Sequence, residues 1–293
     1  MNNYLWLQKK WKEENYLPSQ YYNKLLKPYV FGGLEDTAVF KNFLETLSAC
    51  DNALELGCGT GRGSHTFRGE FPKSRFEMLD LSETMINCVK PRFDSSLTSF
   101  VCQDSLSYMS HTKNTYDLVF SLWSFSHSIH QTMEKLTDQR KGFESIEGIF
   151  ETFLRNNIRS GGSFYLIHFD SQSEEQRILL KQWAKIHPLY SAYKEPSHSY
   201  KMIEKSLKKL SDQGYLEYDI QHLKGEPITY KNMDEALEIF INFHLEGALQ
   251  RTNDTDITNS VLEDLRTYFE DRQTTAGEII IQPGCYIMKA TIR

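Results

Sequence analysis

The sequence predicts an α/β fold with a parallel sheet covered by helices on both faces. Two observations support this class. Short apolar segments alternate with stretches of helical periodicity between residues 53 and 169, and a glycine-rich loop follows the first apolar segment. Strands that are apolar throughout are buried on both faces, and helices of about 10–15 residues between them are typical of parallel sheets.

The elements of this region follow from apolar patterning and from helix-end signals. A helix is expected over residues 35–48, after a break at Gly32 and Gly33. Strands are expected at residues 53–56, 76–80, 99–102, 116–121 and 163–169, and helices at 61–70, 83–93 and 142–158. Ser82 is a suitable N-cap for the helix that begins at residue 83. Gly161 and Gly162 are expected to end the long helix as C-cap glycines.

The pattern changes beyond residue 170. Helices are expected near residues 172–186 and 198–212, a strand at 214–223 and a helical stretch at 232–271. Two final strands, 278–281 and 285–290, are separated by a turn at Pro283 and Gly284. We interpret them as the last strands of the sheet, with a helical insertion at about residues 228–275 before them.

Composition and charge exclude several classes of protein. The chain has 293 residues, 40% hydrophobic and 25% charged, with a formal net charge of -6. These values predict a folded protein of one large domain or a core with a subdomain, and they argue against general binding of duplex nucleic acid. No apolar run reaches the length of about 18 residues that would indicate a membrane span, and the N-terminus lacks a secretory signal. The five scattered cysteines predict a reduced, cytoplasmic protein without a metal site.

The most informative segment is the glycine loop after the first strand. A dinucleotide-binding loop has the pattern G-x-G-x-x-G, but Arg62 stands where the third glycine is needed, and counting from Gly59 the third position is Ser64. The sequence instead fits an acidic residue, a hydrophobic residue and then G-x-G-x-G, from Glu55 to Gly61. Glycines here let a ligand approach the backbone at the carboxyl ends of the strands.

The segment LELGCGTG at residues 54–61 resembles motif I of class I S-adenosylmethionine-dependent methyltransferases. Asp80 at the end of the second strand, Asp104 after the third and YDLV at residues 116–119 follow in that family's order. The resemblance covers about residues 50–170. It implies a Rossmann-like methyltransferase fold with a seven-stranded, mostly parallel sheet whose last strand, within 278–292, is antiparallel.

The resemblance also implies a cofactor site for S-adenosyl-L-methionine. Asp80 would bind the ribose hydroxyls, Asp104 would lie near the adenine amino group, and Glu55 would face the cofactor's amino-acid end or the loop amides. The full set of expected cofactor residues is Glu55, Gly57, Cys58, Gly59, Gly61, Asp80, Leu81, Met85, Asp104, Ser105, Ser121 and Tyr21. For Asp80 and Asp104 the alternative is a capping carboxylate at a helix N-terminus.

The segment after the fourth strand, residues 121–130, is where acceptors bind in the family. His127 is the candidate general base and Trp123 a candidate wall of the pocket, with His130 as a second substrate contact. The alternative is a capped turn with surface histidines. Residues 1–48 are expected to form a helical lid in which Tyr16, Tyr21 and Tyr22 touch the cofactor or substrate; the alternative is that these aromatics only pack the helices.

We therefore expect three regions: the lid at 1–48, a cofactor-binding core at 49–170, and the rest of the core with its insertion at 171–293. The insertion is similar in layout to that of histamine N-methyltransferase. The expected activity is SN2 transfer of a methyl group to a nitrogen or oxygen of a small molecule, with no nucleic-acid, membrane or metal partner. Two alternatives stay open, a non-catalytic sensor or scaffold that binds the cofactor and an NAD-dependent oxidoreductase. The sequence leaves the oligomeric state open.

Overall fold

The computed structural model describes residues 19–134, 139–186, 196–245, 249 and 254–293. The chain divides into two compact units that interleave along the sequence. The sheet unit comprises residues 34–170, 196–223 and 285–293, and the second unit comprises residues 1–33, 171–195 and 224–284. Each unit is built from three separate segments, so neither is a continuous stretch of the chain.

Seven strands form the main sheet in the order β5-β4-β3-β6-β7-β11-β8. Their bounds are β3 Asn52–Leu56, β4 Arg75–Asp80, β5 Thr98–Cys102, β6 Tyr116–Leu122, β7 Ile158–Phe169, β8 Leu216–Lys224 and β11 Gly284–Ile292. The pairs β3–β4, β4–β5, β3–β6 and β6–β7 are parallel, and β11 pairs with β7 antiparallel. The prediction of a mostly parallel sheet with an antiparallel last strand is confirmed. The strand order reverses between β3 and β6, the position at which such sheets bind ligands.

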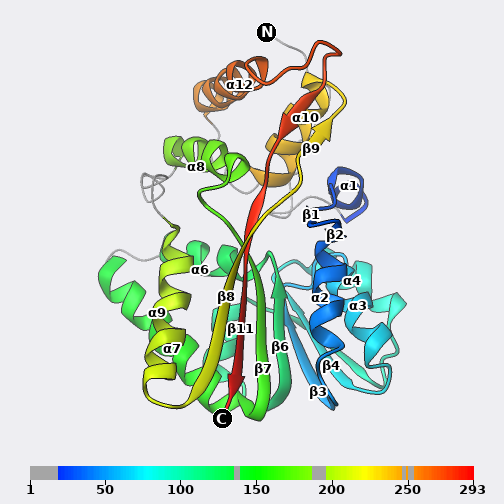
Figure 1. Cartoon of the computed structure of the whole chain (residues 1–293), viewed down its shortest axis with the longest axis vertical. Helices are drawn as coiled ribbons and strands as arrows, with labels where there is room; N and C mark the ends of the chain where they lie inside the picture. The colour runs from blue at the N-terminus through cyan, green and yellow to red at the C-terminus, as the bar shows by residue number, and fades with distance from the viewer. Residues whose placement is uncertain (1–18, 135–138, 187–195, 246–248, 250–253) are drawn as a thin grey trace. The chain divides into compact units, whose positions relative to one another are not determined.

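Helices cover both faces of this sheet, as predicted (Figure 1). On one side lie α2 Asp36–Leu44, α3 Arg62–Glu70 and α4 Glu83–Val89, the last followed by the short 3₁₀ helix Lys90–Arg92. On the other side α7 Gln139–Asn157 packs with α5 Ser105–His111, α6 Phe125–Glu134 and α9 His198–Asp212. Ser82 caps α4 as predicted, because its hydroxyl accepts a hydrogen bond from the Met85 amide at 3.3 Å.

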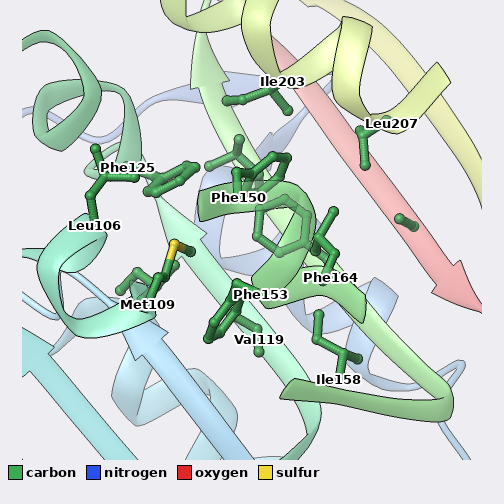
Figure 2. Packing of buried hydrophobic residues seen from close by; sticks show 14 of the residues in the cluster. Leu106, Met109, Val119, Phe125, Phe150, Phe153, Ile158, Phe164, Ile203 and Leu207 are labelled. Atoms are coloured by element: carbon green, nitrogen blue, oxygen red, sulfur yellow. The ribbon is translucent and has the colours of Figure 1, made fainter. Parts of the chain in front are cut away.

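The core between the sheet and the α7 layer is rich in phenylalanine (Figure 2). Phe150 and Phe153 from α7 pack with Phe164 of β7, Phe125 of α6 and Ile203 of α9, and all five are fully buried. Burying each such side chain contributes about 1.5–3 kcal/mol. This packing fixes the strands whose carboxyl ends carry the candidate site.

The second unit is mainly helical. It contains α1 Ser19–Leu25, β1 Val30–Phe31, α8 Glu174–Ile186, α10 Met233–Ile239, a π-helical turn Phe240–His244 and α12 Thr255–Glu270. Strands β9 Ile228–Tyr230 and β10 Ile279–Ile281 pair antiparallel in a small sheet of their own. The remaining short strand, β2 Leu34–Glu35, belongs to the sheet unit.

Two predictions of the elements are wrong. Gly161 and Gly162 do not end the long helix, because α7 ends at Asn157 and both glycines lie inside β7. The register between β6 and β7 shifts there, with Tyr116 opposite Ile158 and Leu118 opposite Ser163, so the extra residues form a bulge that the positive φ of Gly161 permits. Strand β10 is not part of the main sheet, because it pairs with β9. Among the helices of the described residues, none is long and apolar enough to cross a membrane.

Candidate functional site

The glycine loop between β3 and α3 is shaped by three glycines with positive φ. Gly57, Gly59 and Gly61 have φ of 76°, 49° and 90°. A Cβ at Gly57 would lie 1.9 Å from Oγ of Ser124, so only glycine allows the turn after β6 to approach the loop. A Cβ at Gly59 would meet nothing within 4 Å, which leaves open space beside the loop at that residue. The loop therefore touches the neighbouring turn at one end and is open at its middle.

Asp80 and the end of β4 hold this loop in place. The amides of Gly57 and Cys58 donate to the Leu79 carbonyl at 2.8 and 2.9 Å. The Gly59 amide donates to Oδ2 of Asp80 at 2.7 Å, while Oδ1 accepts from the Ser82 amide at 2.9 Å. Burial raises the pKa of Asp80, and these amide hydrogen bonds oppose the shift. Asp80 thus lies at the strand end that the sequence predicted, in contact with the open part of the loop.

Glu55 is almost fully buried in β3, 2% exposed, and needs a polar partner. That partner is Ser64 of α3, whose hydroxyl donates to Oε2 of Glu55. Burial raises the pKa of Glu55 well above its ordinary value, and the Ser64 hydrogen bond opposes this only in part. A Cβ at Gly63 would lie 2.7 Å from Oε1 of Glu55, so the glycine at this position makes room for the carboxyl group.

The other expected cofactor residues lie in different environments. Leu81 is 42% exposed directly after Asp80, whereas Met85 is 2% exposed on α4. Asp104 is the N-cap of α5 and accepts a hydrogen bond from the Ser107 amide at 2.9 Å, which is the alternative role foreseen for it. Ser105 is buried at the start of that helix. Cys58 is buried within the loop, and Tyr21 lies on α1 in the second unit, where only its backbone is described.

Ser121 links the two strands at which the sheet order reverses. Its hydroxyl donates to the Leu56 carbonyl at 2.7 Å and accepts from the Phe125 amide at 3.1 Å. The side chain is fully buried. Ser121 therefore joins the end of β3 to the start of α6 and shapes the turn that follows β6.

Trp123 is held in an uncommon conformation at the start of this turn. Its φ of 71° is the one positive value among the non-glycine residues that the structure describes. The indole N–H donates to Oδ2 of Asp36 at 2.7 Å, the backbone N–H donates to the Ile167 carbonyl at 2.9 Å, and the ring lies 4.7 Å from that of Phe169. The indole N–H is thus engaged within the protein, and the ring is fixed beside an aromatic neighbour.

The two candidate histidines lie on α6 and differ in their surroundings. His127 is exposed, and its ring packs edge-on against Phe169 with centroids 5.9 Å apart. His130 is half-buried, and burial together with the nearby His127, His168 and His198 lowers the pKa of His130 to about 3. At neutral pH His130 is therefore uncharged and a weak base, which leaves His127 as the better candidate for proton transfer.

Sequence reasoning missed Asp36. This carboxylate, the first residue of α2, is fully buried and receives both guanidinium nitrogens of Arg62 and the indole N–H of Trp123. In the sequence Asp36 looks like any acidic residue in the first turn of a helix, and Arg62 stands out only as a departure from the dinucleotide pattern. No local signal joins two residues so far apart in the chain.

His168 at the end of β7 was also missed. It is 2% exposed; Nδ1 lies 2.7 Å from the Phe169 carbonyl and Nε2 lies 2.9 Å from Oγ of Ser199. A carbonyl only accepts, so Nδ1 carries the proton and the Ser199 hydroxyl donates to Nε2. Burial lowers the pKa of His168 to about 4, so this histidine is neutral and structural.

The expected lid residues are less fully described. Tyr22 packs against Phe243 with ring centroids 4.9 Å apart, both in the second unit. Tyr16 lies outside the described residues. Among the residues that the structure describes, no group of three or more His, Cys, Asp or Glu side chains could hold a metal ion.

Comparison with known proteins points to one family. Residues 53–141 match the family model described as a methyltransferase domain. The chain is 35% identical over 128 residues to malonyl-[acyl-carrier protein] O-methyltransferase 2 of Ilyobacter polytropus, covering 40% of this chain and 48% of that protein. It is 32% identical over 127 residues to a malonyl-[acyl-carrier protein] O-methyltransferase of Priestia megaterium, covering 43% of each.

The chain thus spans about half the length of the curated relatives that it matches. Among solved structures, the YcgJ protein of Bacillus subtilis is similar with a TM-score of 0.51 and 12% identity, covering 88% of this chain and 97% of that one. At that identity the likeness concerns the fold alone.

Proposed function

Residues 53–141 form a class I, S-adenosylmethionine-dependent methyltransferase domain, and from this premise we propose that the chain transfers a methyl group to a small-molecule acceptor. One observation carries the proposal. The open glycine loop is hydrogen-bonded to the buried Asp80 at the point where the strand order of the sheet reverses. Such a loop lets a nucleoside ligand approach the backbone where doubly wound sheets bind their ligands.

The residues around the loop fit the cofactor. Asp80 keeps lone pairs that can accept hydrogen bonds from ribose hydroxyls, and the exposed Leu81 offers an apolar surface beside it. The space beside Gly59 leaves room for a ligand against the backbone. Asp104 stands after β5 with one carboxylate oxygen used in capping α5, so its other oxygen is a candidate acceptor for the adenine amino group.

When bound, the cofactor would supply an electrophilic methyl on a sulfonium: the acceptor lone pair would bond to the methyl carbon, and the carbon–sulfur bond would break to release the neutral thioether. The task of the protein is to hold the acceptor at the attack distance and to exclude water. The aromatic pair of Trp123 and Phe169 gives the acceptor side a surface that attracts cations by about 0.5–2 kcal/mol. His127, exposed beside Phe169, is the candidate to take the proton that an acceptor must lose.

We favour an amine nitrogen as the acceptor because of the charges around the turn after β6. Residues 121–134 contain no lysine or arginine. The guanidinium of Arg62 is already paired bidentately with Asp36, the residue that also binds Trp123. A carboxylate acceptor is best held by a free cationic group, whereas an amine needs aromatic faces and a neutral proton acceptor.

A second candidate is a carboxylate oxygen on a carrier-bound acyl chain, because two relatives bear names of that kind. Carrier proteins that are acidic dock on basic surfaces. Helix α9 carries four lysines, but Lys205 and Lys209 pair with Glu147 and Glu151 of α7, and Lys208 pairs with Asp212. This face is therefore largely neutralised, which weighs against docking there.

The cofactor assignment is tested by calorimetric titration with S-adenosylhomocysteine. Wild type should bind at micromolar concentration, about -8 kcal/mol, and Asp80→Asn should bind at least tenfold more weakly. Asp94→Asn is the matched control, because Asp94 also accepts an amide hydrogen bond from the residue two positions on, at 2.8 Å, but its side chain is exposed and bonded within its own turn. Equal affinity in all three proteins would contradict the role given to Asp80.

The acceptor is tested with labelled S-adenosylmethionine and two panels, small amines and malonyl thioesters. Turnover confined to amines supports the proposal, and turnover confined to malonyl thioesters supports the second candidate. Cofactor binding without transfer to either panel would favour a non-catalytic sensor or scaffold, and stabilisation by NAD alone would favour an oxidoreductase. A cytoplasmic location and the absence of a nucleic-acid partner stay predictions.

A further inference from the structure

The carboxylate of Asp36 joins three elements of the sheet unit. Its oxygens accept hydrogen bonds from both guanidinium nitrogens of Arg62, at 3.0 and 2.6 Å, and from the indole N–H of Trp123 at 2.7 Å. The amide of Thr37 adds a fourth donor at 2.9 Å. Asp36 begins α2, Arg62 begins α3 directly after the glycine loop, and Trp123 begins the turn after β6.

The hydrogen bonds to the Asp36 carboxylate fix the orientation of its partners as well as binding them. The Asp36 side chain is fully buried, and a buried carboxylate persists only where its partners are close and well oriented. A guanidinium binds a carboxylate as a planar fork, so the position of Asp36 defines the position of Arg62 and hence of the last glycine of the loop. The indole bond does the same for the turn after β6.

The loop and the turn also touch each other directly. Gly57 approaches Ser124 so closely that a Cβ on Gly57 would lie 2.3 Å from the Ser124 Cβ. Next to Ser124, Trp123 keeps a φ of 71°, a conformation that is costly for a residue with a side chain and needs support from its surroundings. A shift of the turn therefore moves the loop, and Asp36 is bonded to both.

We propose that Asp36 is a positioning residue that couples the cofactor loop, through Arg62, to the acceptor side of the site, through Trp123. The inference rests on the proposed methyl transfer. It assigns to a buried residue outside the glycine motif the task of setting the distance between the two reacting groups. Small errors in that distance cost large factors in rate.

The first test compares Asp36→Asn with Asp117→Asn, both assayed well below their melting temperatures. Asp117 is a matched control, because it accepts hydrogen bonds from Arg159 and from the amides of Asp51 and Asn52 at the opposite end of the sheet. Both variants should lose thermal stability. Asp36→Asn should also lower kcat at least tenfold and raise the Kd for S-adenosylhomocysteine severalfold, whereas Asp117→Asn should leave both within twofold of wild type.

The coupling between the loop and the acceptor side is tested with variants of the two partners of Asp36, Arg62 and Trp123. Arg62→Gln, measured at saturating cofactor, should still lower kcat at least threefold. Without the bond from Arg62, Asp36 no longer holds the acceptor side at a fixed position relative to the glycine loop. Trp123→Phe keeps an aromatic ring on Phe169 but removes one hydrogen bond to Asp36. In the Asp36→Asn background it should lower kcat no further, since the bond is already impaired.

The proposal is overturned if Asp36→Asn, like its control, is less stable but keeps the wild-type kcat and Kd. It is also overturned if Arg62→Gln changes only the affinity for the cofactor. If Asp36→Asn does not fold, the kcat of Arg62→Gln at saturating cofactor decides the matter. A wild-type protein that binds no S-adenosylhomocysteine contradicts the proposed function itself. An active wild type with an equally active Asp36→Asn contradicts the coupling alone, so the two failures are distinguishable.

Discussion

At the scale of single residues, the site depends on positions where a side chain would not fit or could not adopt the backbone conformation. Gly57 combines both requirements, since its φ is 76° and a Cβ would lie 1.9 Å from Oγ of Ser124. Gly161 has nearly the same φ, 77°, but a Cβ there would meet nothing within 4 Å. The two glycines therefore separate the cost of backbone conformation from the cost of a steric clash.

We expect Gly57→Ala to be destabilised more than Gly161→Ala. Both substitutions force alanine into the left-handed region, at about 1–2 kcal/mol, and Gly57→Ala must in addition displace Ser124. Gly57→Ala should also lose measurable affinity for S-adenosylhomocysteine, while Gly161→Ala keeps it. Denaturant unfolding and calorimetric titration measure these effects, and equal losses of stability in the two variants would show that the close approach to Ser124 is not a constraint.

At the scale of elements, two histidines of the sheet unit have pKa values well below the ordinary value. His168 connects the end of β7 to Ser199 of α9, and its low pKa follows from burial. His130 on α6 has its pKa lowered in the same way. In the folded protein these rings resist protonation, whereas in the unfolded chain they take up protons near pH 6.5.

The folded protein should therefore lose stability as the pH falls from about 6.5 towards 4. Over that range the unfolded state binds protons that the folded state does not, so the free energy of unfolding decreases. The pKa of about 4 for His168 corresponds to a loss of about 3 kcal/mol from this residue. His168→Gln should flatten the pH dependence, and His111→Gln, which removes an exposed histidine, should not. Identical pH profiles for the two variants, measured by urea unfolding, would refute this account.

At the scale of the whole molecule, the chain forms two compact units, each assembled from separated segments. In the second unit the start of α8 connects several of those segments. Glu174 accepts hydrogen bonds from Arg272 at 2.5 Å and from the Gln282 amide at 2.9 Å. Glu175, fully buried, accepts from the Tyr29 hydroxyl at 3.2 Å. Two adjacent carboxyl groups thus contact separate segments of the unit in opposite electrostatic settings.

Glutamine substitutions at these neighbours should change stability in opposite directions at pH 8. Burial raises the pKa of Glu175 to about 7, so its ionisation weakens the folded state as the pH rises from 4.5 through 7. Glu175→Gln removes this cost and should stabilise the protein at pH 8 by up to about 3 kcal/mol. Although burial acts against it, the bonds from Arg272 and Gln282 hold the pKa of Glu174 below its ordinary value. Glu174→Gln should therefore be destabilised at pH 8, and thermal unfolding of both variants at pH 5 and pH 8 measures the contrast.

The sequence predicted the sheet and its cofactor loop well because those features have local causes. Buried parallel strands are apolar throughout, and the loop after β3 needs glycines where φ is positive. The sequence failed at Gly161 and Gly162, since a glycine pair permits a helix end and a strand bulge equally. Only the pairing of β7 with β6 makes the bulge the outcome.

By itself, the sequence determined the fold class, the strand end that carries the loop, and the position of Asp80 at the end of the next strand. These depend on side-chain periodicity and on backbone conformations that few residues can adopt. Tertiary structure alone decided that Asp36 joins Arg62 to Trp123, that Ser64 is the partner of Glu55, and that His168 is neutral. Those outcomes depend on burial and on contacts between residues distant in the chain, which raise or lower the cost of charge and which no local pattern records.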